Sequence, residues 1–210
     1  MKFWSDTFAD GARVPEHCAF CAPASGEPPL TMSSNKSPHF AWSDAPAATR
    51  SFAIVCCDPD VPSVGDNVNQ AGKTVAADLP RVDFYHWLLW NISADTGSLA
   101  EGAHSDSVTA RGKGGPAAPG GGAHGVNDYT GWFAGDADMA GDYYGYDGPC
   151  PPWNDERLHH YVFTIYALDV EHVPADEGVT GAALLEAIKP HVIDSASWTG
   201  TYTLNPSLLG

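Results

Sequence analysis

The stretch YDGPCPPWNDERLHHYVFTIYALD, residues 146–169, joins a proline-rich loop to an apolar strand. Proline fixes φ and lacks a backbone donor, so the segment Gly148–Pro152 is expected to form a rigid wall outside any sheet. His159 and Tyr161 stand two residues apart at the head of the strand, and alternate residues of a strand face the same side. The sequence therefore predicts an imidazole and a phenol side by side at a pocket rim, with His160 facing the other way.

A second apolar stretch brings two carboxylates to the end of a strand. Residues 51–58 read as a buried strand, and the run Asp58-Pro-Asp60-Val-Pro-Ser63 follows directly. One of these aspartates is expected to orient a histidine and to stabilise its protonated form, and the other could accept an ammonium group. The alternative for whichever carboxylate faces away from the pocket is that it caps the proline-containing turn.

A third apolar stretch, residues 84–92, carries a single histidine, His86, which alternation places on the face of Leu88 and Trp90. A buried imidazole needs a hydrogen-bond partner. Taken alone, His86 is most simply a core histidine bonded to a backbone carbonyl. The polar groups at the ends of the other two strands favour the alternative, in which His86 belongs to the same pocket.

These motifs, in this order along the chain, resemble the phosphatidylethanolamine-binding proteins, and more narrowly their bacterial Raf-kinase-inhibitor-like branch. The similarity runs from the Phe-Ala-Asp-Gly segment at residues 8–11, through Ser-Pro-His-Phe-Ala-Trp at 37–42, to Asp169 and beyond. It implies a β-sandwich with a Greek-key arrangement and a few peripheral helices, formed by one domain that spans residues 1–210. It also implies a small anion pocket for phosphate or a phosphorylated headgroup. The residues that it implies for this pocket are Asp58, Asp60, His86, Gly148, Pro149, His159 and Tyr161.

The chemistry of these residues agrees with anion binding. Imidazoles, a phenol and the backbone amide of a residue such as Gly148 are hydrogen-bond donors. No lysine or arginine occurs in the motifs, so affinity for phosphate should be modest. We expect a non-catalytic binding or regulatory protein, with no cofactor and no metal, that recognises phosphorylated small molecules, phospholipid headgroups or a phosphorylated segment of a target such as a kinase or protease. The alternative is a hydrolase or metal-dependent enzyme using the same Asp, His and Tyr side chains.

The spacing of apolar runs and turn residues is typical of an all-β protein. Strands are expected at residues 51–58, 84–91 and 160–170, the last of them central because both of its faces are largely apolar. Residues 195–204 read as an edge strand, and only residues 180–189 show a helical pattern, with Thr180 as a candidate N-cap.

Acidic residues dominate the charge of the chain: 26 Asp and Glu face only 10 Lys and Arg, which gives a formal net charge of −16. Such a surface repels nucleic acid and anionic lipid, so neither is an expected partner, and no stable membrane insertion is expected. A salt-adapted surface is a second reading of the same charge.

The first residues lack an apolar signal region, and five cysteines form no even set, so a cytoplasmic protein with reduced thiols at Cys18 and Cys21 is expected.

Two segments depart from the family pattern, and both flank the pocket. The link from Ser63 to His86 is long, and an insert rich in glycine, aspartate and aromatic residues separates Tyr129 from Tyr146. The insert reads either as solvated loop or as an aromatic lid or homodimer contact. The aromatic residues concerned are Trp132, Phe133, Tyr143 and Tyr144.

Overall fold

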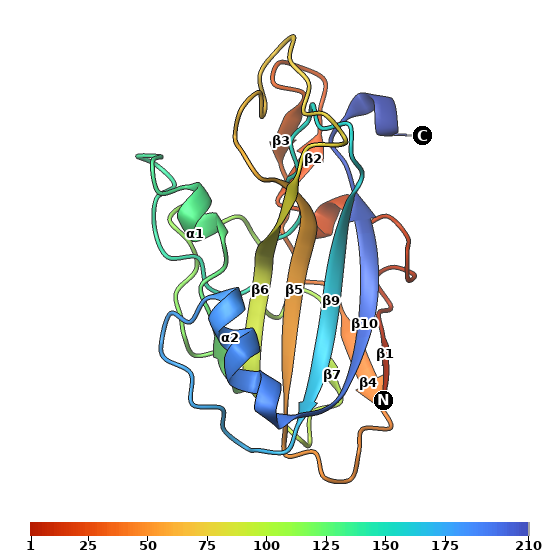
Figure 1. Ribbon diagram of the computed structural model, residues 1–210, viewed down its shortest axis with the longest axis vertical. Helices are drawn as coiled ribbons and strands as arrows, with labels where there is room; N and C mark the ends of the chain where they lie inside the picture. Colours follow the sequence, from red (N-terminus) through yellow and green to blue (C-terminus); the bar gives the residue numbers. More distant parts are fainter. Residues whose placement is uncertain (210) are drawn as a thin grey trace.

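The computed structural model describes residues 1–209, which fold around one antiparallel five-stranded sheet (Figure 1). The strand order across this sheet is β10-β9-β5-β6-β8, so β9 is an interior strand and β10 lies at an edge, as the sequence predicts. The strands are β5 (Ser51–Pro62), β6 (Arg81–Ser93), β8 (Ala123–His124), β9 (His159–Leu168) and β10 (Val192–Tyr202). The expected strands are therefore confirmed, with β5 and β6 longer than their apolar runs indicate.

A smaller sheet, ordered β1-β4-β7, packs against one face of the large sheet and encloses the main core. Phe40 of the small sheet contacts Phe163 of β9, with ring centroids 4.7 Å apart. A separate two-stranded ribbon, β2-β3, completes the β structure. These strands are β1 (Lys2–Trp4), β2 (Cys21–Pro23), β3 (Leu30–Met32), β4 (Phe40–Ser43) and β7 (Ser98–Leu99). The mostly β, two-sheet architecture predicted from the sequence is confirmed.

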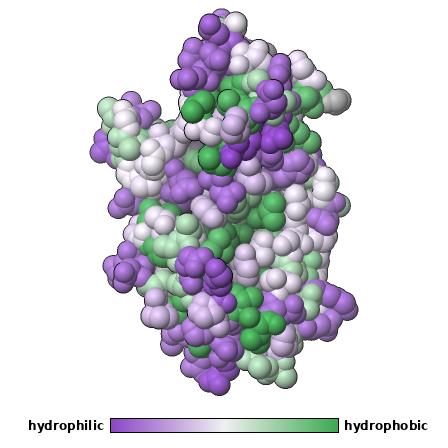
Figure 2. All heavy atoms as spheres, in the orientation of Figure 1, coloured by the Kyte–Doolittle hydropathy of each residue, from purple (hydrophilic) through white to green (hydrophobic). Residues whose placement is uncertain are grey.

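Helix α2 (Gly181–Ile188) covers part of the opposite face, where Leu184 and Ile188 pack with the outward side chains of β5 and β6 (Figure 1). Thr180 stands at the N-cap position, but its side chain makes no capping hydrogen bond. Figure 2 shows this face with apolar residues over the central strands among hydrophilic ones. The other helical segments are α1 (Tyr129–Trp132) and the 3₁₀ turns η1 (Glu16–Cys18), η2 (Lys189–His191) and η3 (Pro206–Leu208). Within residues 1–209, no helix has the length and apolar character needed to cross a bilayer.

A disulfide joins Cys21 of β2 to Cys150 in the proline-rich loop, with a Cα–Cα distance of 4.9 Å. The expectation of a reduced thiol is therefore wrong for Cys21. Cys18, Cys56 and Cys57 are free. The two bridged residues are 129 positions apart, and the pairing arises because backbone hydrogen bonds from residues 20 and 21 to the Pro149 carbonyl already hold β2 against the loop.

Candidate functional site

A cavity of about 300 Å³ opens at the end of the large sheet. The β5–β9 ladder ends at the pair Cys57–Val162, and beyond it the side chains of the two strands line the cavity. Asp58 comes from β5 and His159 and Tyr161 come from β9, and each is about 1 % exposed. The alternation that the sequence predicts for β9 is present, because His159 and Tyr161 are buried while His160 is exposed.

His86 reaches this cavity through a β-bulge in β6. Cys56 of β5 pairs with Trp87, but the next residue, Cys57, pairs with Tyr85, so His86 is an extra residue in the ladder. A bulge changes the direction of a side chain. His86 therefore contacts Tyr161, with ring centroids 5.0 Å apart, rather than lying on the face of Leu88 and Trp90 as strict alternation predicts.

His159 lies between two carboxylates. Its Nδ1 is 2.7 Å from Asp58 Oδ2, and its Nε2 is 3.1 Å from Asp155 Oδ2. Asp155 in turn accepts two hydrogen bonds from the Arg81 guanidinium, at 2.5 and 3.0 Å. Burial alone would lower the pKa of His159, but the hydrogen bonds to Asp155 and Asp58 outweigh it and raise the pKa to about 9. His159 is therefore an imidazolium at neutral pH, with both N–H groups donated to protein carboxylates.

His86 has the opposite charge state. Its Nδ1 donates to the backbone carbonyl of Asp147 at 2.7 Å, which assigns the Nδ1–H tautomer to the neutral ring. Burial lowers the pKa of His86, although the Asp58 carboxylate opposes this shift. The neutral ring therefore offers its other nitrogen, Nε2, as a hydrogen-bond acceptor. Burial, reinforced by Asp58, also holds the pKa of Tyr161 well above its usual value, so the phenol is neutral.

Three residues that the family resemblance places in the pocket do not line the cavity. Asp60 faces outward, where its Oδ2 accepts hydrogen bonds from the backbone N–H and the Nδ1 of His160. Asp58 is therefore the carboxylate that orients a pocket histidine. The N–H of Gly148 donates to Asn35 Oδ1 at 2.8 Å, so this amide is not free for an anion. Pro149 has a structural role, because its carbonyl accepts hydrogen bonds from the backbone N–H groups of residues 20 and 21.

Gly148 has a packing role that explains why glycine stands there. A Cβ at this position would lie 2.1 Å from the carbonyl oxygen of Cys18. Any larger residue would therefore push the loop away from the η1 turn. The glycine is needed for this close approach, whereas the sequence argument assigned its amide to ligand binding.

The sequence argument missed Asp155 and Arg81. Asp155 lies in the loop four residues before His159, and Arg81 begins β6, so neither belongs to an apolar pattern or to one of the recognised motifs. Arg81 and Asp155 form a buried ion pair with side chains 5 % and 1 % exposed. An arginine and an aspartate that flank two predicted strands are the only signal that the sequence offers for this pair.

Apolar groups form the walls of the cavity. Both flanking segments contribute, because the link after Ser63 supplies Val64 and Val68, and the insert supplies Trp132 and Phe133. Trp132 is 52 % exposed at the mouth. Of the four aromatic residues expected to form a lid, Trp132 and Phe133 line the cavity. Tyr143 is fully buried in the core, and Tyr144 lies outside the lining of the cavity.

Comparisons with known proteins give one family. The sequence profile described as "Phosphatidylethanolamine-binding protein" matches residues 4–203. The UPF0098 protein YbhB of Escherichia coli is 31 % identical over 97 % of this chain and 100 % of its own length. A UPF0098 protein of Chlamydia muridarum is 32 % identical over 96 % of this chain and 98 % of its own. The crystal structure of E. coli YbcL, titled as a new member of the mammalian PEBP family, superposes with a TM-score of 0.67 at 26 % identity, covering 96 % of this chain and 97 % of that one.

Proposed function

This chain belongs to the phosphatidylethanolamine-binding protein family, and on that premise we propose that it is a binding protein whose cavity receives a small phosphorylated ligand. The observation that carries the proposal is the neutral His86 ring. Its Nδ1–H is fixed on the Asp147 carbonyl, so Nε2 is left to accept a proton or a hydrogen bond inside the cavity.

A phosphate ester suits this acceptor because its second pKa is about 6, so that near neutral pH it carries or readily gains one proton. The proton can be shared between a phosphate oxygen and His86 Nε2. The charged groups near His86 are the Asp58 carboxylate and the His159 imidazolium, and its other neighbours include the backbone of Gly148 and the rings of Phe84, Tyr129 and Tyr161. An anion beside this ring raises the pKa of His86, so binding takes up a proton.

The charge of the cavity floor favours a zwitterion over a simple anion. Asp58 and Asp155 carry two negative charges, while His159 and Arg81 carry two positive charges, so the cluster is neutral. Phosphate gains no net attraction there, whereas an ammonium group on the same ligand could approach Asp58. Phosphoethanolamine, free or as a lipid headgroup, is therefore the proposed ligand chemistry.

Titration calorimetry from pH 5.5 to 8.5 tests the proposal with inorganic phosphate, phosphoethanolamine and phosphatidylethanolamine vesicles as separate arms. Phosphoethanolamine should bind more tightly than phosphate, and both affinities should rise as the pH falls. The vesicle arm distinguishes a lipid source from a free ligand. His86→Ala should weaken binding by roughly 1.5–3 kcal/mol and remove the pH dependence.

Asp60→Asn is the matched control, because Asp60 belongs to the same motif but faces away from the cavity. Its binding should equal that of the parent. A pH-independent affinity in the parent, or unchanged binding by His86→Ala, would contradict the proposal. The hydrolase alternative has less support, because both nitrogens of His159 are bound to carboxylates and this ring cannot accept a substrate proton, which leaves that role to His86. Turnover of a generic phosphomonoester that His86→Ala abolishes would overturn this preference.

A further inference from the structure

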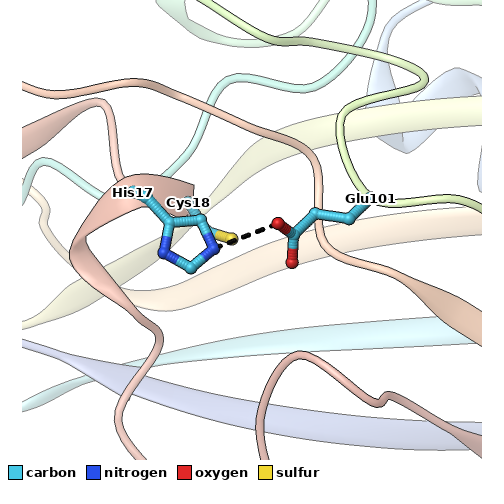
Figure 3. A group of neighbouring side chains, drawn as sticks. All are labelled: His17, Cys18 and Glu101. Carbon is cyan, nitrogen blue, oxygen red and sulfur yellow. Dashed lines mark ion pairs between the residues drawn. The ribbon is translucent and has the colours of Figure 1, made fainter.

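A histidine, a cysteine and a glutamate converge outside the cavity lining (Figure 3). His17 and Cys18 belong to the η1 turn, and Glu101 follows β7. Each side chain offers one potential ligand atom, and all three atoms lie within 4.8 Å of one another. The imidazole Nε2 and the carboxylate Oε1 are 3.3 Å apart.

The backbone that carries two of these side chains is held in place. The carbonyl of His17 accepts the N–H of Lys36 at 2.9 Å, and the carbonyl of Cys18 accepts the hydroxyl of Tyr146 at 2.7 Å. Tyr146 is fully buried. The η1 turn therefore presents its imidazole and thiol from a fixed position.

Glu101 is also oriented by its neighbours. The Thr7 hydroxyl accepts the backbone N–H of His39 at 3.0 Å, so its own proton is donated to Glu101 Oε2 at 2.7 Å. This bond leaves Oε1 to face His17. Carboxylates that bind metals are held by such outer hydrogen bonds, which fix the direction of the ligand oxygen.

We propose that His17, Cys18 and Glu101 bind a zinc ion. A thiolate and a carboxylate together offset the two positive charges of the ion, and thiolate with imidazole selects zinc over calcium or magnesium. Nitrogen and oxygen ligands about 2.0–2.2 Å from a tetrahedral zinc lie roughly 3.3–3.5 Å apart. The spacing of the His17 and Glu101 atoms matches this range, and the Cys18 sulfur lies within 4.8 Å of both.

Solvent reaches the trio from one side, since the side chains of His17 and Glu101 are 45 % and 38 % exposed while Cys18 is fully buried. A water molecule can occupy the fourth position on the exposed side. A cysteine that binds no metal is mostly a protonated thiol at neutral pH, so the metal-free site holds a thiol. Formation of the zinc–sulfur bond therefore expels the thiol proton to solvent, and binding should release protons.

Titration of the metal-free protein with zinc and with cobalt(II), without reductant so that the disulfide stays intact, tests the site. We expect one ion per chain by competition with a chromophoric chelator, proton release, and thiolate-to-cobalt charge-transfer absorption. Cys18→Ser should abolish that absorption. His17→Gln and Glu101→Gln should each weaken zinc binding at least tenfold, and Thr7→Val should weaken it roughly 10- to 100-fold.

Glu16→Gln and Cys57→Ser are the matched controls, because each removes a similar group outside the trio, and both should bind zinc like the parent. Circular dichroism will show whether Cys18→Ser folds. If it does not, the variants at His17 and Glu101 still test the site, because both side chains are half-exposed. Zinc binding that survives in His17→Gln and Glu101→Gln, cobalt binding without thiolate absorption, or no saturable binding would overturn the proposal. None of these outcomes depends on the phosphate site.

Discussion

His159 is a structural cation at the base of the cavity. Its two N–H groups are donated to Asp58 and Asp155, and Arg81 completes a charge-balanced row behind it. Removing one member of a buried ionic cluster is costly because the remaining charges keep the penalty of burial without their partner. Under the proposed function, this residue therefore acts on a ligand through the position of Asp58, while His86 is the histidine available for direct contact.

His159→Ala should accordingly lower the free energy of unfolding by roughly 3–5 kcal/mol. Urea denaturation at pH 7 measures this loss. His160→Ala is the control on the same strand, since its side chain is 49 % exposed and its pair with Asp60 should contribute less than about 1 kcal/mol. A variant at His159 as stable as the parent would show that the two carboxylates do not depend on the imidazolium.

The sequence was sufficient to predict which strand ends line the cavity, but not the partners of each side chain. Asp58, His159 and Tyr161 line the cavity as strand alternation and the order of motifs predict, whereas His86 lines it because of the bulge in β6. Charge partners such as Asp155 are set by contacts between distant segments. Nothing in the local sequence distinguishes its buried carboxylate from an exposed loop aspartate.

At the scale of elements, apolar runs predicted β5, β6, β9 and α2 but not the irregularities between them. The bulge that turns His86 into the cavity exists only in the pairing of β5 with β6. Three register shifts occur along this one pair of strands. Because each extra residue reverses the alternation that follows it, a face assignment made from one strand alone fails beyond the first bulge.

The proline-rich loop depends on a covalent link as well as on its prolines. Cys150 is bridged to β2, and both sulfur-bearing residues line the cavity, so the disulfide forms part of its wall. Disulfides persist mainly in oxidising compartments. The expectation of reduced thiols therefore no longer supports the predicted cytoplasmic location, which stays a prediction.

A thiol assay under denaturing, non-reducing conditions should find three free thiols, at Cys18, Cys56 and Cys57, and five after reduction. Cys21→Ser should lower the free energy of unfolding by about 2–5 kcal/mol, the usual effect of removing a disulfide that closes a long loop. Five free thiols before reduction would contradict the bridge.

For the whole molecule, the net charge of −16 acts on an approaching ligand at long range, whereas the neutral cavity floor acts at short range. The long-range field repels anions, so a phosphate ligand must be held by short-range contacts. The modest affinity for phosphate that the absence of lysine and arginine in the motifs predicts stays a prediction. Added salt should therefore leave binding unchanged or strengthen it, because screening reduces the repulsion.

Buried histidines contribute to the pH dependence of the stability of the whole molecule. His104 and His124 form a buried pair with Nδ1 and Nε2 3.0 Å apart, and burial lowers their pKa values to about 4 and about 3. The unfolded chain binds these protons from about pH 6.5 downward, so stability should fall as the pH drops below 6.5. His159 has a pKa raised to about 9, so its contribution is complete below 6.5 and is lost as the pH rises toward 9.

Stability should consequently be greatest near pH 6.5 and should decline by about 1 kcal/mol per pH unit between pH 7 and 9, the slope for one proton lost on unfolding. Urea denaturation at steps from pH 4 to 9.5 measures both limbs. Asp147 and Asp128 oppose this loss of stability at low pH, because burial raises the pKa of each carboxyl, whereas burial lowers the pKa of His86, which adds to the loss. His124→Gln should flatten the acid limb, and His159→Gln should flatten the alkaline limb whatever its overall stability. An alkaline limb that keeps its slope in His159→Gln would show that the imidazolium between Asp58 and Asp155 is not its cause.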